Sequence, residues 1–354
     1  MEWKEAVEKS EKAAKLISSG FNVAHSGNNY PLPGVGVGIT RKTGESKLVF
    51  HLAYGAQRST VEDIIATLDK KTPAEVRVVG VAHTLPFSAD TRNADLKSNY
   101  TERLRPLNIG CFISRQDSFN GGTLGCFVRK RDDSSDFFIL SCAHVLTNLG
   151  EGQTGDVIVQ PARNDLAKTP EDNIAILSEF TPLIPKGKLG TKQLTVTSKA
   201  NNKTPLDAAI AKLTCEKTLQ NQGMLDELSF RNYYKREDLT RIFFESEEEV
   251  QVFKIGSNTQ KTSGFIKEIK YALPSLMYVD DKLQNSLCCR YEDVIVIETQ
   301  PSEATFSEHG DSGSIIYDKA GIAIGLLIGG SSDQTLTYAL PIETVLNRLD
   351  IELI

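Results

Sequence analysis

The sequence of 354 residues predicts a mostly β fold, in which two antiparallel β-barrels follow a small α/β domain and a helix ends the chain. From about residue 110, short apolar runs alternate with turns rich in Gly, Asn, Asp and Pro, and helical patterns are few. About 240 residues of this kind can supply the strands of two barrels. Before residue 86, helical and extended patterns alternate instead, which favours a separate α/β unit.

Residues 1–85 are predicted to form this α/β domain in the order α-β-β-α-β. Apolar residues recur at helical spacing in the first helix, which is expected to stop at Gly20. Ser59 and Glu62 have the spacing of a capping box and are expected to open the second helix. The predicted elements are helices over 1–20 and 59–70 and strands over 35–39, 47–54 and 75–82.

The rest of the chain divides by composition. Residues 86–109 are polar and irregular and are predicted to be a linker, and residues 110–220 form the first barrel. Residues 221–249 are charged and partly helical, as expected of a connection enlarged by an insertion. Residues 250–354 form the second barrel and a terminal helix over 342–349.

Composition excludes several classes of function. The net charge of −6 offers no basic surface for nucleic acid or an anionic membrane. No apolar run approaches the roughly 20 residues that span a bilayer. Sparse cysteines without metal-ligand spacing, and the absence of a secretory signal pattern, favour a cytoplasmic protein without a metal or other cofactor.

One polar turn has the composition of a nucleophile site. Residues 308–314 read Glu-His-Gly-Asp-Ser-Gly-Ser and open directly into an apolar strand. Gly310 and Gly313 permit a tight backbone and leave N–H groups uncovered, which suits the stabilisation of an oxyanion. Ser312 stands where a nucleophile would stand. The alternative is a plain structural turn, so the prediction depends on finding a base and an acid elsewhere.

Two residues suit those roles. A serine hydroxyl needs a base within hydrogen-bonding reach, and the base must be oriented. His144 follows a buried strand through two small residues, and Asp207 begins the apolar run 208–213. A carboxylate at the head of a buried strand is costly unless paired, and an imidazole N–H is a suitable partner. Alone, His144 would be structural and Asp207 a turn or cap residue.

These residues occur in the chain order His, Asp, Ser, and at this point a resemblance is visible. Segments 140–145, 206–210 and 310–314 resemble the signature segments of trypsin-like serine proteases, over about residues 110–350. The resemblance implies two six-stranded, chymotrypsin-like barrels. A closer resemblance is to the bacterial and plant trypsin-like group that includes the rice narrow-leaf protein, through segments 32–38, 122–128, 160–161, 252–256 and 338–342.

The resemblance also implies further site residues. The backbone N–H groups of Gly310 and Ser312 would form the oxyanion hole. The base of the specificity pocket would lie near Phe306 and one wall near Ile328 and Gly330, with His309 at the rim or in solvent. Because Phe306 is not a carboxylate, an apolar or small side chain is expected before the cleaved bond.

The sequence departs from the digestive members of this family. Those enzymes are activated by cleavage, and the new amine pairs with the Asp that precedes the nucleophile. No Arg-Ile-Val-Gly-Gly cleavage signal is present here. Asp311 must therefore find another partner, or the oxyanion hole is not formed at rest.

Two classes of function follow. The first is a cytoplasmic serine endopeptidase that acts on a protein or peptide through an acyl-enzyme, held latent until a partner or oligomerisation through residues 1–85 switches it on. The second is a catalytically silent binding or scaffold module with a protease fold. An α/β-hydrolase is disfavoured, because Ser314 replaces the last Gly of G-x-S-x-G and no βαβ pattern occurs.

Overall fold

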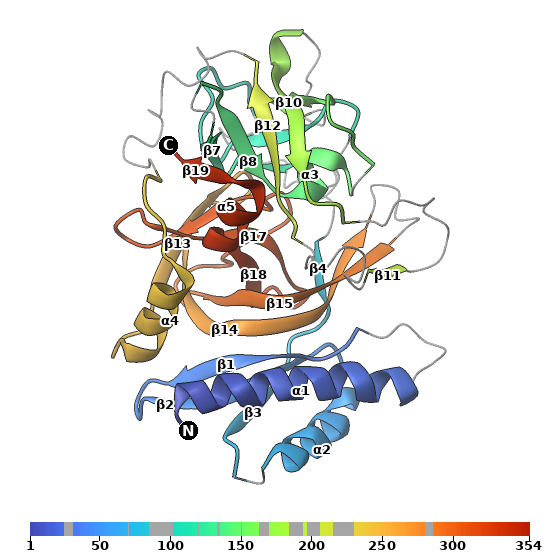
Figure 1. The fold of residues 1–354 in the computed structure, drawn as a ribbon, viewed down its shortest axis with the longest axis vertical. Coiled ribbons are helices and arrows are strands. Elements are labelled where there is room, and N and C mark those ends of the chain that lie inside the picture. The colour runs from blue at the N-terminus through green and yellow to red at the C-terminus, as the bar shows by residue number, and fades with distance from the viewer. Residues whose placement is uncertain are drawn as a thin grey trace.

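The mostly β prediction is confirmed. The computed structural model contains two large sheets, one above the other in Figure 1. It describes residues 1–24, 31–69, 71–84, 102–118, 120–132, 135–149, 151–162, 170–183, 194–196, 206–214, 230–279 and 286–354.

The upper sheet in Figure 1 has eight strands in the order β19-β7-β8-β12-β10-β9-β5-β6. All neighbouring pairs are antiparallel. Its eight strands, which include β19 from the C-terminal end of the chain, exceed the six expected. The elements are β5 (Phe112–Arg115), β6 (Gly122–Thr123), β7 (Cys126–Lys130), β8 (Phe138–Ser141), α3 (Ala143–Thr147), β9 (Val157–Val159), the 3₁₀ turn η4 (Pro170–Asp172), β10 (Asn173–Phe180), β12 (Ala209–Leu213) and β19 (Ile351–Leu353).

The second sheet has eleven strands and is built around the long strand β14. The predicted C-terminal helix is confirmed as α5, whose apolar face is buried. The elements of this half are β11 (Leu194–Val196), α4 (Arg236–Glu245), β13 (Gln251–Gly256), β14 (Gln260–Val279), β15 (Ser286–Thr299), β16 (Ile315–Tyr317), β17 (Ala323–Ser331), β18 (Leu336–Pro341) and α5 (Ile342–Leu349).

The N-terminal strands β1 to β4 continue the second sheet and supply four of its eleven strands. β1 pairs antiparallel with β14, with Val35 opposite Ala272. Two helices pack on these strands through an apolar cluster that includes Ile17, Phe50 and Val61. The elements are α1 (Trp3–Ala24), β1 (Gly34–Thr40), β2 (Glu45–Leu52), the 3₁₀ turn η1 (Gly55–Gln57), α2 (Arg58–Leu68), β3 (Ala74–Val78) and β4 (Ala82–Thr84).

Three local predictions for this unit are wrong. The first helix does not stop at Gly20 but continues to Ala24. The second helix does not open on a capping box at Ser59, because the 3₁₀ turn η1 precedes it and Gln57 is its N-cap. The predicted strand over 75–82 is two strands, β3 and β4. Gly80, with φ +79°, turns the chain between them, and β4 then pairs with β14 and β17 instead of β2.

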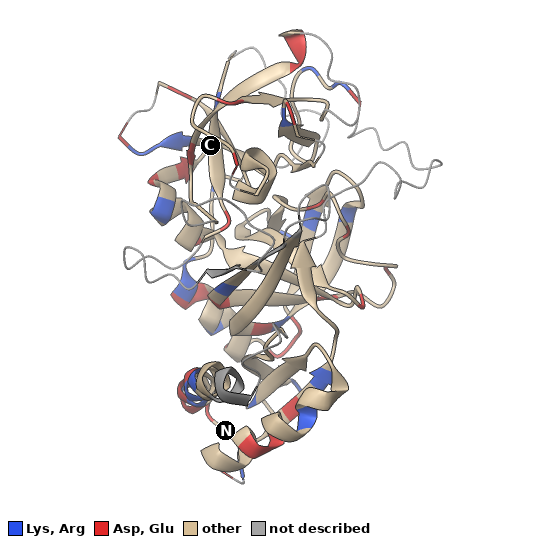
Figure 2. Ribbon diagram, turned by 90° about the vertical axis from the view of Figure 1, so that its right-hand side faces the viewer, with Lys and Arg blue, Asp and Glu red and all other residues tan. Residues whose placement is uncertain are grey.

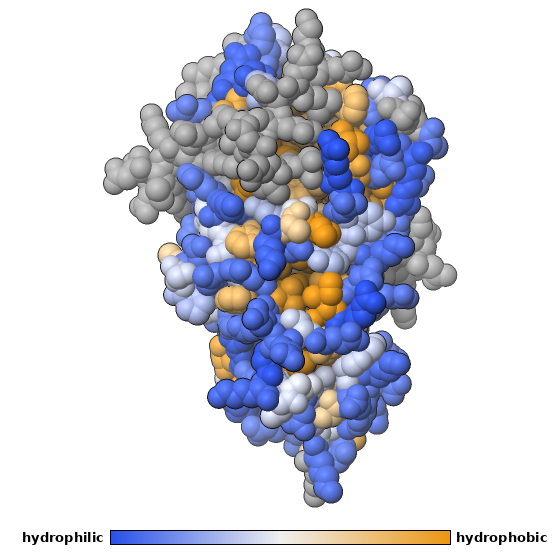
Figure 3. All heavy atoms as spheres, turned by 90° about the vertical axis from the view of Figure 1, so that its left-hand side faces the viewer, coloured by the Kyte–Doolittle hydropathy of each residue, from blue (hydrophilic) through white to orange (hydrophobic). Residues whose placement is uncertain are grey.

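Among the described residues that Figure 2 shows, no large region carries a single charge, in agreement with the modest net charge of the sequence. In Figure 2, acidic and basic residues are intermixed along the helices and strands. Figure 3 shows a mainly hydrophilic face with apolar side chains reaching the surface near its middle. Among the described residues, no helix is both long and apolar enough to cross a membrane.

Candidate active site

His144 is held at the edge of the upper sheet by a short helix. β8 ends at Ser141, Cys142 is the N-cap of α3, and His144 is the second residue of that helix. Val145 and Leu146 are buried and anchor the helix in the core. The imidazole is 12% exposed, which leaves it room to face a substrate.

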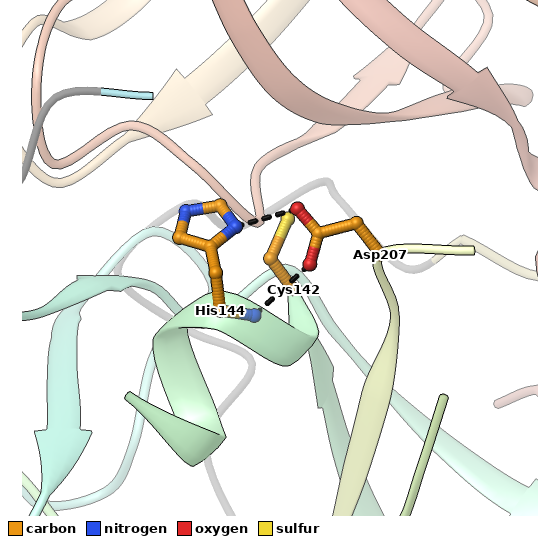
Figure 4. Close-up of side chains that lie close together, drawn as sticks. All are labelled: Cys142, His144 and Asp207. Carbon is orange, nitrogen blue, oxygen red and sulfur yellow. Dashed lines mark hydrogen bonds and ion pairs between the residues drawn. The ribbon is translucent and has the colours of Figure 1, made fainter. Parts of the chain in front are cut away.

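Strand register brings Asp207 to His144. β12 pairs antiparallel with β8, with Ala209 opposite Ser141, so Asp207 lies beside the residues that follow β8. The fully buried Asp207 Oδ1 accepts the backbone N–H of His144 at 2.9 Å, and Oδ2 lies 2.5 Å from His144 Nδ1 (Figure 4). The carboxylate favours the proton on Nδ1, because it can only accept. Nε2 is then left unprotonated, as a general base must be.

Cys142 lies beside this pair but is not a ready metal ligand. The Cys142 sulfur, a ring nitrogen of His144 and a carboxylate oxygen of Asp207 all lie within 4.8 Å of one another (Figure 4). Burial, followed by the charge of Asp207, raises the pKa of the thiol well above its usual value. The thiol donates to the Leu327 carbonyl at 3.1 Å instead. Since a metal needs the thiolate, we interpret Cys142 as a contact between the two sheets.

Ser312 lies in a tight turn whose glycines are required. Gly310 and Gly313 have φ of +97° and +94°. A Cβ on Gly313 would lie 2.2 Å from Ser141 Oγ, so a larger residue cannot fit. The Gly310 carbonyl accepts hydrogen bonds from Thr123 Oγ1 at 2.8 Å and Ser257 Oγ at 2.7 Å. Among the described residues, the N–H groups of Gly310 and Ser312 donate to no backbone carbonyl.

The turn packs against the segment that carries His144. Thr123 donates its backbone N–H to the Ser312 carbonyl at 2.8 Å. A Cβ on Gly122 would lie 2.5 Å from Val145 Cγ2 and 2.7 Å from the Ser312 oxygen, so Ser312 and the residue after His144 are near neighbours. In the described part of the chain, however, no hydrogen bond joins Ser312 Oγ to His144. Such bonds are often long in unliganded enzymes and tighten when substrate binds.

Asp311 has a partner that the sequence analysis did not single out. Lys254 of β13 lies 3.2 Å from Asp311 Oδ2, and both side chains are fully buried. Burial lowers the pKa of Lys254, and the charge of Asp311 opposes this. The carboxylate also accepts the N–H groups of Asn258, Thr259 and Glu308 and the Thr259 hydroxyl, at 2.6–3.1 Å. A lysine between apolar residues of a strand is the one sequence signal that could have identified this pair.

A pocket of about 300 Å³ opens beside Ser312. The predicted residues His309 and Gly330 line it, whereas Phe306 and Ile328 do not. Phe306 is fully buried among apolar side chains, so it does not form the base of this pocket. The lining residues are His83, Thr84, Ser307, Glu308, His309, Ser312, Leu327, Gly329, Gly330, Ser331, Ser332, Gln334 and Leu336.

The N-terminal unit contributes to this pocket. His83 and Thr84 belong to β4, and the His83 ring lies 5.8 Å from the His309 ring. Burial, and then the neighbouring His309, lowers the pKa of His83 to about 4. His83 is therefore neutral at neutral pH. Nothing local in the sequence indicates that His83 contacts a residue so far along the chain.

Comparison with known proteins adds a family match. The model of Peptidase family S64 matches residues 205–350. The match includes Asp207 and Ser312 and supports a serine protease fold for this part of the chain. His144 lies outside the matched range. No curated protein matches the chain.

Solved structures of proteases are similar at low identity. Thermobifida fusca Protease A is 13% identical with a TM-score of 0.40, covering 70% of this chain and 99% of its own. A glutamic acid-specific serine protease, described as using a histidine triad in substrate binding, is 12% identical with a TM-score of 0.40, covering 70% and 100%. The active form of the Rv3671c protease from M. tuberculosis is 13% identical with a TM-score of 0.34, covering 78% and 91%.

Proposed function

We propose that the protein is a serine endopeptidase that works through an acyl-enzyme. The observation that carries the proposal is the buried Asp207 paired with both the ring and the backbone of His144, beside a glycine-bounded turn that presents Ser312. No cofactor enters this chemistry.

The proposed reaction proceeds in two halves. Ser312 Oγ attacks the peptide carbonyl carbon while its proton passes to His144 Nε2, and the N–H groups of Gly310 and Ser312 stabilise the oxyanion. The C–N bond then breaks as His144 gives the proton to the leaving amine. Water, deprotonated by His144, next attacks the acyl carbon. The ester bond to Ser312 Oγ breaks, the acid product leaves, and His144 returns the proton to Ser312 Oγ. Throughout, Asp207 keeps the imidazole in one tautomer and stabilises its charged form.

The peptidase reaction is tested by cleavage of internal bonds in a peptide library, read by mass spectrometry. We expect the unmodified protein to cleave and Ser312→Ala to be inactive. Ser302→Ala is the matched control, because Ser302 is an exposed serine outside the pocket. Equal cleavage by the Ser312→Ala variant would refute the assignment of the nucleophile.

We also propose that the resting protein is partly latent, because β4 limits access to the site. An extended peptide can bind a protein by adding a strand to the edge of a sheet. β4 already pairs antiparallel with β17, with His83 opposite Gly330 and Ala82 opposite Ser331, and two β4 residues line the pocket beside Ser312. A substrate that used this part of β17 would have to displace β4.

A substitution in β4 tests whether this strand blocks the substrate site or forms part of it. His83→Pro removes a backbone donor from β4 and should raise the cleavage rate several-fold, because β4 pairs less well. His83→Asn keeps the backbone donor but also loses the ring, so the difference in rate between the two variants isolates the effect of β4 pairing. A lower rate for His83→Pro would mean that β4 builds the substrate site instead of blocking it.

The second candidate is a silent binding module. It is favoured by the missing Ser312–His144 hydrogen bond in the described residues and by the β4 pairing, and full biological activity of Ser312→Ala would support it.

We propose three further properties: a cytoplasmic location, a regulatory partner or oligomer contact through residues 1–85, and a closer relation to the group of the rice narrow-leaf protein.

A further inference from the structure

Asp207 has a hydrogen-bond donor from the other half of the molecule. Tyr278, near the end of β14, donates its hydroxyl to Asp207 Oδ2 at 3.0 Å. The same ring meets the His144 ring edge-on, with centroids 5.5 Å apart and planes at 65°. Tyr278 and Asp207 are both fully buried, so water does not replace this contact.

The Tyr278 hydroxyl is itself hydrogen-bonded to a second tyrosine hydroxyl. The hydroxyls of Tyr278 and Tyr291 lie 2.5 Å apart, and Tyr291 is on β15, the antiparallel neighbour of β14. Because Tyr278 gives its proton to Asp207, Tyr291 must be the donor between the two tyrosines. Burial and the charge of Asp207 raise the pKa of each tyrosine well above its usual value, so both remain donors.

Asp207 Oδ2, which accepts the hydrogen bond from Tyr278, is also the oxygen nearest to the imidazole of His144. Oδ1 is occupied by the His144 backbone N–H, and Oδ2 is shared between His144 Nδ1 and the Tyr278 hydroxyl. A donor on a carboxylate oxygen spreads its negative charge and fixes its plane. The Tyr278 hydroxyl therefore affects both how strongly Asp207 attracts the imidazole proton and where the imidazole is held.

We propose that Tyr278 is a positioning residue for the catalytic pair, and that Tyr291 completes a hydroxyl relay ending at Asp207 Oδ2. This inference rests on the proposed function and extends it, because the relay connects the second sheet to an aspartate of the first. Tyr278 touches neither substrate nor the reacting atoms and acts through Asp207.

The test uses Tyr278→Phe, which removes the hydroxyl and keeps the ring. We expect fluorophosphonate labelling of Ser312 to slow about tenfold, the rate equivalent of one charge-assisted hydrogen bond. We also expect the acid limb of its pH–rate profile to move to higher pH, because Asp207 then holds the imidazolium more strongly. Tyr234→Phe is the matched control, since Tyr234 donates to Asp318 at 2.9 Å away from the pocket.

A second readout does not require activity. In the Ser312→Ala background, the NMR resonance of the proton on His144 Nδ1 should move further downfield on Tyr278→Phe and stay in place on Tyr234→Phe. Tyr291→Phe should give the same changes at smaller size, which keeps the test decisive if Tyr278→Phe does not fold. If neither the unmodified protein nor His83→Pro takes a label, the proposed function fails and this resonance alone decides the relay. An unmoved resonance in both relay variants would overturn the inference.

Discussion

Lys254→Met is expected to lower the reactivity of Ser312, although Lys254 does not line the pocket. Met keeps the apolar stem of the side chain but leaves the buried Asp311 carboxylate without its cation. Breaking a buried ion pair in this way costs about 3–5 kcal/mol of folding stability. Because Asp311 lies between Gly310 and Ser312, reorganisation of its carboxylate moves both oxyanion donors. We expect fluorophosphonate labelling to fall about 10²–10³-fold, the usual cost of losing one such donor.

The measurements for Lys254→Met are a urea melt and the labelling rate. Lys261→Met is the control, because Lys261 is an exposed lysine on the adjoining strand. The double variant with Asp311→Asn removes the unpaired charge, and we expect it to recover stability but not the full rate. Unchanged stability and labelling in Lys254→Met would show that Asp311 does not need this partner.

Asp207→Asn is expected to lower labelling of Ser312 by about 10⁴-fold. The asparagine has one acceptor oxygen in place of two, so it cannot serve both the ring and the backbone N–H of His144. An amide N–H facing His144 Nδ1 would force the proton onto Nε2, and the base would be lost.

Asp318→Asn is the control for this substitution. Asp318 also accepts a tyrosine hydroxyl and backbone N–H groups, but it lies outside the pocket. We expect both variants to fold, so circular dichroism should match the unmodified protein. A labelling loss below tenfold in Asp207→Asn would contradict the role given to Asp207.

The sequence was sufficient for the pairing of His144 with Asp207. A buried strand followed by small residues predicts where His144 stands, and a carboxylate heading a buried strand requires a partner. The terminal helix over 342–349 was likewise predictable, because its apolar spacing is local.

Contacts set by strand register could not be predicted in this way. The Tyr278 hydroxyl reaches Asp207 across 71 positions of sequence, and the pairing of β1 with β14 depends on register between distant strands. β4 was predicted as the end of one strand, and only its pairing with β17 brings His83 to the pocket. Phe306 was placed at the pocket by resemblance alone, whereas its side chain is buried in the core.

The central claim is that Ser312 is an activated nucleophile. Its most direct test is the intact mass of the purified protein after exposure to an active-site fluorophosphonate, with Ser312→Ala beside it. We predict one label per chain, at a rate that depends on β4, and no label on Ser312→Ala. The contradicting result is an unlabelled protein even when His83→Pro weakens β4 pairing, or a label that persists in Ser312→Ala.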